Sequence, residues 1–492
     1  MPAYSSKELI VLLKNLTRQE KTSVRKKIKD VETNIVIKYI WKDDSINERQ
    51  LNSKLKKFKN SKSSDAEDII KQVLECIAPI IQTDDDVSLL LQKLVFTRFL
   101  IEKHLHRRAL KHIIKIKKKA TQIEQFDILL QAQRIQLSLL GYTNKQLAIK
   151  SELIEDMADV ISYWNNDIIA LKLGEQTEKL FLKLGLSASS NDENDIVSLL
   201  NELESFSHKT HISFNSLLFS QNALVDIYRF KGEYEKAIAA QKVIIDECNS
   251  KPILKKSRLA QYVQAIVNYC NRMLEANMLK SVKDLKEIEQ LVKQLKQYTK
   301  IPDRLKQYLD GTIEFAKFSI YKDNWELDLA IKQIPKLEAN SLPVRQNQVL
   351  DSIHKYEFAV VHFYKGNYEK ASQYLNSINN EVRKIYPDLY LFSRILALLL
   401  LIFSKEKVNI SRFKSNHDAL RKAIAKANHS THFEKALLSF CHHYYMAKTT
   451  EKKAGAIAKL KNSIPSIKKK SPNSFMFFDP EKWIAQIQLD PK

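Results

Sequence analysis

The chain has 492 residues, of which 28% are charged and 44% hydrophobic, a balance that excludes an intrinsically disordered protein. It contains only 7 glycines and 11 prolines, too few for the many tight corners of a doubly wound sheet, a barrel or a sandwich. We therefore predict an all-α protein made of long helices with short connections.

The formal net charge of +23 is concentrated at the two ends. Residues 1–120 carry 27 Lys and Arg against 15 Asp and Glu, and residues 405–492 carry 18 against 7. The middle, residues 121–404, carries 35 of each sign. This asymmetry suggests an acidic partner, although it says nothing about the fold.

The four cysteines, Cys76, Cys248, Cys270 and Cys441, are far apart and form neither a C-x-x-C pair nor a disulfide framework. The N-terminus shows no basic segment leading into an apolar core with a cleavage site. We therefore expect a reducing compartment and a cytoplasmic location.

Two capping boxes, Thr17-x-x-Glu20 and Ser45-x-x-Glu48, predict helices over about 16–28 and 45–58. The polar stretch 57–68 that follows predicts a loop.

A stripe of positive charge recurs every four residues on a predicted helix over 102–119. Its members are Lys103, Arg107, Lys111, Lys115 and Lys119, with Leu110, Ile113 and Ile114 on the opposing side. The stripe suits a track for phosphates or for an acidic peptide. It equally suits a solvated outer face in a lysine-rich protein, which is the interpretation we favour.

Nearly the same phrase occurs twice, as "FKGEYEKAIAA" (230–240) and "YKGNYEKASQY" (364–374). In each, an apolar helix ends at a Gly, an aromatic follows two residues later, and an Ala follows three residues after that. These residues are Gly232, Tyr234 and Ala237 in the first copy, and Gly366, Tyr368 and Ala371 in the second. Glycine permits a positive φ in a tight turn, and alanine lets two helices approach closely.

This turn resembles that of the tetratricopeptide repeat, whose second helix often ends at a proline, here Pro252. Gly232 and Gly366 are 134 positions apart, which is four units of 33.5 and close to the repeat length of about 34. The resemblance implies a superhelical stack of antiparallel helical hairpins, an α-solenoid with a concave face, that serves as an interaction module. An isolated hairpin inside an unrelated bundle is the alternative, which a second copy disfavours.

Two further repeats are degenerate. Residues 321–334 place Trp325 where the Tyr would be and Asp328 where the Ala would be. Residues 102–116 have Ala109 at the Ala position and His106 at the aromatic position.

Polar segments at 185–195 and 463–474 punctuate the chain, the second with two prolines and a lysine run. We therefore predict a basic helical region over 1–85, tetratricopeptide-like repeats over 86–404, and a basic helical region over 405–492. The apolar run 395–403 is far shorter than the roughly 20 residues of a membrane span, so it predicts a buried helix.

The chain ends are also similar to those of uncharacterised Bacteroidota helical-repeat proteins. Members of that group open with a Leu-x-x-x-Glu-Lys helix, here Leu16 to Lys21, and close with an aromatic-Asp followed by a Trp helix. Here the closing pattern runs from Phe478-Asp479 to Trp483 with "PEK" inserted. This resemblance implies no biochemical activity.

No phosphate-binding glycine loop, nucleophile elbow or His-Glu-x-x-His helix occurs, so we expect neither an enzyme nor a cofactor. Histidines gather in two places, as His104, His106 and His112, and as His429, His432, His442 and His443 beside Cys441. We interpret them as ordinary interhelical or surface residues and expect no metal site.

Three hypotheses remain. The first is a non-enzymatic scaffold that holds a protein or peptide partner in a concave groove. The second is a nucleic-acid-binding or gene-regulatory protein that uses the basic ends. The third is a hidden enzyme that uses carboxylates on helix faces or the group of His429, His432 and Cys441.

Overall fold

The structure is a computed structural model of the 492-residue chain, and every regular element in its described part is a helix. The described residues are 9–10, 13–14, 16, 18–28, 31–42, 46–55, 69, 86–140, 144–184, 193–298, 301–339, 348–378, 387–404, 410–426, 431–470 and 475–487. Within these ranges no strand occurs, which confirms the predicted all-α class.

The helices toward the N-terminus are α2 (Arg18–Lys27), α3 (Val31–Lys42), α4 (Glu48–Leu55), α6 (Asp86–Glu102), α7 (His106–Gln122), α8 (Phe126–Leu139) and α9 (Asn144–Leu184). The following ones are α10 (Glu193–Ser207), α11 (Phe214–Phe230), α12 (Tyr234–Ser250), α13 (Pro252–Ser257), α14 (Leu259–Glu275), the 3₁₀ helix η3 (Val282–Leu285), α15 (Lys286–Tyr298) and α16 (Asp303–Asp323). The last ones are α17 (Leu327–Ala339), α19 (Gln348–Tyr364), α20 (Tyr368–Asn376), α22 (Pro387–Phe403), α23 (Ile410–Lys426), α24 (His432–Met446), α25 (Thr450–Lys470) and α26 (Pro480–Gln486).

The chain divides into two compact units. Unit 1 comprises Met1–Ala120 and Gln131–Leu140, and unit 2 comprises Thr121–Leu130 and Gly141–Lys492. In unit 1, the helices before residue 70 share a small apolar core, to which the Trp41 indole adds a hydrogen bond to the Leu13 carbonyl (2.9 Å).

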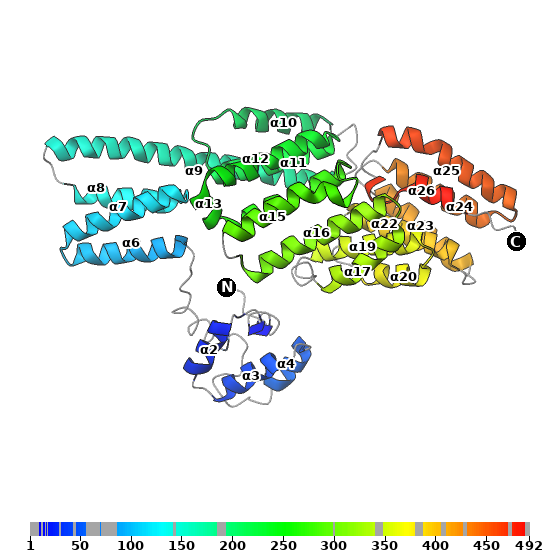
Figure 1. Ribbon diagram of the computed structural model, residues 1–492, viewed down its shortest axis with the longest axis horizontal. Helices are drawn as coiled ribbons and strands as arrows, with labels where there is room; N and C mark the ends of the chain where they lie inside the picture. Colours follow the sequence, from blue (N-terminus) through cyan, green and yellow to red (C-terminus); the bar gives the residue numbers. More distant parts are fainter. Residues whose placement is uncertain are drawn as a thin grey trace. The chain divides into compact units, whose positions relative to one another are not determined.

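In unit 2, helices that follow one another in the chain pack against one another. The contacts run from α9 to α11, and then through α12, α14, α16, α17, α19, α20 and α22 in chain order (Figure 1). Beyond α22, helices α23, α24 and α25 continue the series, and α26 packs on α25. Each helix is apolar on the sides that its neighbours cover, so burial of those sides is the main stabilising force.

The same turn joins α11 to α12 and α19 to α20. Gly232 (φ +70°) and Gly366 (φ +80°) occupy the left-handed region there. In both turns the amide after the glycine donates back to a carbonyl five residues earlier, from Glu233 to Tyr228 and from Asn367 to His362 (each 2.8 Å). This pair of features is the Schellman motif, which satisfies the carbonyls at a helix end.

Non-glycine residues form this turn at three other places. His104 (φ +57°), Asn277 (φ +54°) and Trp325 (φ +66°) each precede an amide that donates to the carbonyl five residues back, at 2.8–2.9 Å. A bulky residue with positive φ is a true outlier. The turn therefore recurs where its glycine signature is missing, which is why the sequence pattern is hard to follow.

The structure corrects the register predicted for residues 321–334. Trp325 occupies the place of the turn glycine, not that of the tyrosine, so the Ala position falls on Ala330 rather than on Asp328. Ala330 is fully buried, as are Ala109, Ala237 and Ala371 at the equivalent positions. Small side chains at this position let consecutive helices lie close together.

Three local predictions were also wrong. Residues 463–470, predicted to interrupt the chain, continue α25 through Pro465, because Ile464 and Ile467 bury their side chains there. The cap of α4 is a reciprocal pair between Asn47 and Gln50 (3.0 and 3.1 Å), whereas Ser45 lies outside the described residues. Ile114, predicted on the apolar side of its helix, is exposed.

Residues 395–403 lie in α22, whose side chains are largely buried, as predicted. Among the helices that the structure describes, none is both long enough and apolar enough to cross a membrane.

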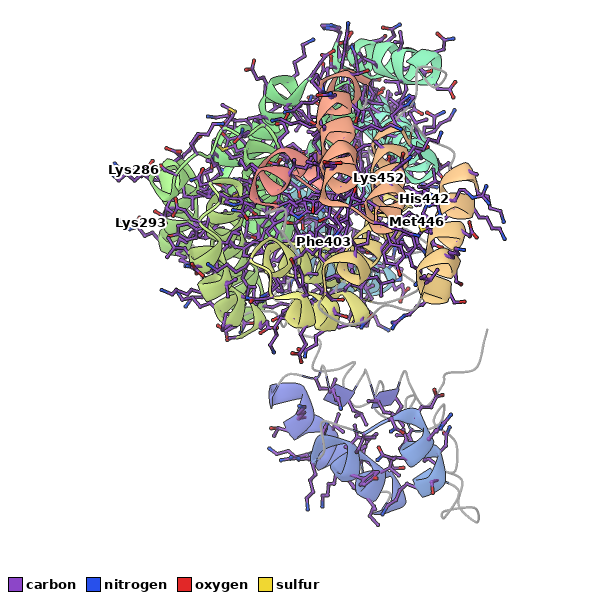
Figure 2. The ribbon with its side chains drawn as sticks, turned by 90° about the vertical axis from the view of Figure 1, so that its right-hand side faces the viewer. Lys286, Lys293, Phe403, His442, Met446 and Lys452 are labelled. Carbon is purple, nitrogen blue, oxygen red and sulfur yellow. The ribbon has the colours of Figure 1, made fainter. Side chains whose placement is uncertain are left out.

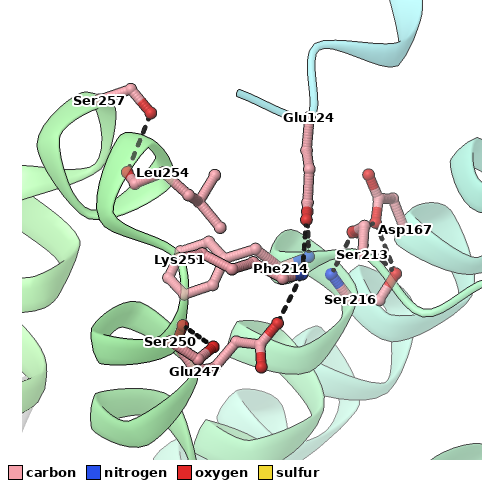
Figure 3. Close-up of polar contacts among 10 residues, drawn as sticks. All are labelled: Glu124, Asp167, Ser213, Phe214, Ser216, Glu247, Ser250, Lys251, Leu254 and Ser257. Atoms are coloured by element: carbon pink, nitrogen blue, oxygen red, sulfur yellow. Dashed lines mark hydrogen bonds and ion pairs between the residues drawn. The ribbon is translucent and has the colours of Figure 1, made fainter. Parts of the chain in front are cut away.

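A polar junction sets the start of α11 (Figure 3). Glu124 accepts a hydrogen bond from the Phe214 amide at the first turn and pairs with Lys251 (2.9 Å). The N-cap residue Ser213 accepts from the Ser216 amide (2.9 Å), and both hydroxyls donate to Asp167 of α9. Carboxylates at a helix N-terminus satisfy its free amides, so this junction aligns α11 with α9 and with the end of α12.

Replacing Gly366 by Ala is expected to destabilise unit 2 by about 1–2 kcal/mol, because a Cβ at φ +80° is strained although no neighbouring atom blocks it. The matched control is Gly455→Ala inside α25, where an added Cβ also meets no neighbouring atom. Alanine has a higher helix propensity than glycine, so this variant is expected to be more stable than the parent by up to about 1 kcal/mol. Urea unfolding followed by circular dichroism measures both. If both variants changed the free energy of unfolding in the same direction, the requirement for glycine in the turn at residue 366 would be contradicted.

Candidate functional site

A cavity of about 770 Å³ lies in unit 2, and the facing sides of three helices form most of its wall. Along α16 the lining residues follow a helical period from Tyr308 through Phe315 to Lys322. Along α19 they run in the same way from Leu350 to Tyr364. One side of α14, the turns that follow α14 and α16, and the facing ends of α11 and α12 complete this part of the wall.

From α14 to α20, helices that line the cavity alternate along the chain with helices that do not, whereas the consecutive helices α11 and α12 both reach its wall. Within the described residues, α15, α17 and α20 contribute nothing to the wall. Lys286 and Lys293 of α15 are exposed and project away from the rest of the helices (Figure 2). From α14 to α20, every second described helix therefore faces the cavity.

The C-terminal segment 475–479 forms another part of the wall. The Tyr356 hydroxyl donates to the Phe477 carbonyl (3.1 Å), and the Asp479 amide donates to the Tyr364 hydroxyl (2.7 Å). The rings of Phe478 and Tyr364 lie 5.3 Å apart. A short stretch of chain, mostly aromatic, is thus held by two tyrosines of α19.

Arg229 of α11 holds Glu275 of α14 at one side of the cavity. Its guanidinium donates to both carboxylate oxygens (3.0 and 2.9 Å), and Asp226 accepts from its third nitrogen (3.0 Å). Arg272 adds a second contact to Glu275 (2.9 Å). Bidentate arginine pairs have a defined geometry, so this group fixes α11 against α14.

Lys322 of α16 and Glu357 of α19 form a second, more deeply buried pair (2.6 Å). Burial by itself lowers the pKa of Lys322, but the charges of Glu357 and Asp323 outweigh it and raise that pKa. Burial raises the pKa of Glu357, and Lys322 opposes the change. Both residues line the cavity, and the pair joins α16 to α19.

His354 stacks on Phe315 with 4.2 Å between ring centroids. Burial lowers the pKa of His354 to about 4, so the imidazole is neutral at physiological pH. The wall of the cavity therefore combines aromatic side chains, such as Phe315 and His354, with the ion pairs of Arg229 and Lys322.

Gly311 of α16 lines the cavity with no side chain of its own. A Cβ built there meets nothing within 4 Å, because the position faces open space. The cavity therefore depends in part on this residue having no side chain.

Of the six repeat-turn residues predicted from the sequence, one lines the cavity. Tyr234 is that residue, and its hydroxyl lies 3.7 Å from the Met476 sulfur. Tyr368 instead packs back on Phe363 of the preceding helix (5.7 Å between rings). Gly232, Ala237, Gly366 and Ala371 shape the turns and interhelical contacts described above.

The basic stripe lies on α7 and the turn before it. Lys103, Arg107, Lys111 and Lys115 are exposed. Lys119 is half-buried and pairs with Asp86 (2.7 Å), which reduces the positive surface by one charge.

No group of three or more His, Cys, Asp or Glu side chains suited to a metal ion occurs in the part of the chain that the structure describes. His429 and Cys76 lie outside that part. His442 is exposed, 5.2 Å from the ring of His417 (Figure 2). Burial raises the pKa of the Cys441 thiol, so this cysteine is suited to packing rather than to nucleophilic chemistry.

Sequence reasoning missed the charged pairs of the cavity and Gly311. Lys322 and Glu357 are 35 positions apart, about one tetratricopeptide unit, and this spacing is the signal that could have linked them. The sequence around Gly311 carries no such signal, because the role of this glycine depends on the cavity that it faces in the folded chain.

No protein-family model matches this chain, and comparisons with curated proteins and with solved structures returned no match.

Proposed function

We propose that this protein is a non-enzymatic scaffold of the tetratricopeptide type that binds a peptide segment of a protein partner in the cavity of unit 2. The observation that carries the proposal is the alternation of lining and non-lining helices from α14 to α20, which is expected of a stack of antiparallel hairpins with a concave face. The recurring Schellman turns support the same architecture.

The size of the cavity favours a peptide over a folded domain. A volume of about 770 Å³ lies within the range of sites that enclose one small ligand, so it accommodates only a few residues of an extended chain. The segment 475–479 is an example within the same molecule of such a chain held by tyrosine hydroxyls.

The lining indicates the chemistry of the peptide. Aromatic side chains such as Tyr308 and Phe315 suit a large apolar side chain. The exposed cations Lys280, Lys468 and Lys482 stand at the wall and suit an acidic group, which would compete with Glu481 for Lys468 and with Asp479 for Lys482. We therefore expect a motif that combines an aromatic or aliphatic residue with Asp or Glu.

Nucleic acid is the second candidate, and we rank it lower. Its support is the exposed part of the basic stripe, which lies in unit 1 and does not line the cavity. Charge alone attracts phosphates without providing a site for bases.

The test uses a peptide-display library selected against the full chain and then measured on two variants. Gly311→Trp places an indole in the cavity and is expected to weaken the selected peptides by about tenfold or more, since each 1.4 kcal/mol corresponds to that factor. Gly311→Ala adds only a methyl group and is expected to retain their affinity while it stabilises α16 by up to about 1 kcal/mol.

Circular dichroism verifies that both variants keep the parent helix content. Selected peptides that bind the Trp variant as tightly as the parent would show that the cavity is not the binding site. Selection that yields no aromatic-acidic motif would contradict the proposed ligand chemistry.

A further inference from the structure

Helix α6 of unit 1 is apolar on two opposite sides. One side is buried and includes Leu90, Leu94 and Leu100. The opposite side is 43–67% exposed and consists of Leu89, Leu91, Val95, Phe96 and Phe99. We refer to these five residues as the α6 face. Contiguous exposed apolar surface of this kind marks an interaction site.

The α6 face is wide. Leu89 and Leu91 form its two edges, because residues two positions apart project about 160° apart around a helix, and the other three members lie between them. An apolar stripe that packs on neighbouring helices is about 100° wide. The α6 face is therefore broader than one docking helix requires, whereas a soft apolar medium covers all of it.

The stretch that contains this face is strongly basic. Residues 86–120, all of which the structure describes, carry 10 Lys and Arg against 2 Asp and Glu. One of the two acids, Asp86, pairs with Lys119, so Glu102 is the only exposed acid of this stretch. Charge complementarity therefore indicates an anionic partner.

Cations of α7 lie beside the α6 face. The ring of Phe96 lies 5.3 Å from the ring of His112 on α7. Arg108 precedes His112 by four residues and Lys115 follows it by three, so both lie on the side of α7 that borders Phe96. Both cations are exposed and thus available to a partner that covers the face.

We propose that the α6 face and the cations beside it bind an anionic lipid bilayer, with α6 lying in the plane of the headgroups. The protruding Phe, Leu and Val side chains enter the boundary of the acyl chains, while Lys and Arg contact anionic headgroups. Lys103 shows this combination locally, since its ammonium lies 5.7 Å from the centroid of the Phe99 ring. Long cationic side chains of this kind cover apolar surface with their stems and keep their charge in water.

The aliphatic members of the face favour lipid over nucleic acid. Single-stranded nucleic acid is held by cations at its phosphates and by aromatic rings on which its bases stack. Leu89, Leu91 and Val95 provide neither a charge nor a stacking surface, and Val95 is the most exposed residue of the face. Burial in the acyl boundary of a bilayer accounts for all five residues.

Co-sedimentation of the full chain with vesicles tests the proposal, using phosphatidylcholine alone and phosphatidylcholine with about 30% phosphatidylglycerol. We expect the parent to bind the anionic vesicles much more tightly than the neutral ones. Val95→Ser combined with Phe99→Ser keeps the charge and is expected to lower the partition coefficient by about tenfold or more. Arg108→Ala combined with Lys115→Ala is expected to lower it by about tenfold or more, since each cation contributes roughly fivefold.

The matched control removes the same charge from α15, where Lys286 and Lys293 are exposed (Figure 2). Lys286→Ala combined with Lys293→Ala is expected to bind the anionic vesicles as the parent does, and circular dichroism verifies the helix content of every variant. A parent that fails to bind anionic vesicles, or that binds neutral ones equally well, overturns the proposal. Undiminished binding by the serine variant shows that charge alone attracts the chain, and undiminished binding by the Arg108 and Lys115 variant shows that these cations do not contact headgroups. Either result also overturns the proposal, and none of the results depends on peptide binding in the cavity.

Discussion

Replacing Glu434 by Gln is expected to stabilise unit 2 by about 3 kcal/mol at pH 7, because the native side chain is a carboxyl buried without compensation. Glu434 lies in the first turn of α24 and is fully buried, and neither carboxylate oxygen has a hydrogen-bond partner among the described residues. Burial raises the pKa of Glu434 from its ordinary value of 4.5 to about 8, and the nearby Asp388 adds to the shift, while the backbone amide of Glu434 itself and Lys435 oppose it.

The direction of the pH dependence follows from this raised pKa. In the folded chain Glu434 keeps its proton up to about pH 8, whereas in the unfolded chain it releases it near pH 4.5. The folded state therefore binds more protons between these values, and its stability falls as pH rises through that window. An amide never ionises, so the Glu434→Gln variant lacks this loss and gains little below pH 4.5.

Urea unfolding at pH 5, 7 and 8, followed by circular dichroism, measures the effect. Glu451→Gln in the first turn of α25 is the matched control, since Glu451 is exposed. We expect the control to follow the parent at every pH. A Glu434→Gln variant whose stability declines with pH as steeply as that of the parent would show that Glu434 ionises normally in the folded state.

Removing one partner of the Lys322–Glu357 pair is expected to cost about 3–5 kcal/mol, because it leaves a charge buried without its counter-ion. The two side chains are 16% and 12% exposed and 2.6 Å apart. Lys322→Met and Glu357→Leu are the single variants. Combining them removes both charges, and the double variant is expected to return to within about 2 kcal/mol of the parent.

Urea unfolding of the parent, the two single variants and the double variant gives a double-mutant cycle. The coupling energy should exceed roughly 2 kcal/mol, since each single change is costly and the combined change is mild. If the double variant lost as much stability as the two single variants together, water rather than the partner side chain would compensate each charge.

The helical class and the two clear turns were predictable from the sequence, for local reasons. Few residues besides glycine adopt a positive φ easily, so Gly232 and Gly366 each mark a turn wherever the rest of the chain lies. A small residue five positions later permits close packing, and Ala109 was predicted correctly on that basis. The low glycine content predicted long helices because a chain with few glycines forms few tight turns.

Trp325 and Pro465 show where local reasoning fails. Trp325 adopts the turn conformation that its bulk disfavours, and its ring packs on Tyr364 at 4.6 Å. Pro465 lies inside α25, and the apolar residues Ile464 and Ile467 beside it are buried. In both cases contacts with distant residues outweigh a local preference of about 1–3 kcal/mol.

The sequence by itself determined that this protein is helical, where two of its tightest corners lie, and that its positive charge collects at the ends, because these properties depend on residue type and short spacing. Only the tertiary structure decided which helix faces enclose the cavity and that Lys322 meets Glu357. Those features depend on which distant surfaces meet, and packing of the whole chain, rather than any local preference, sets that choice.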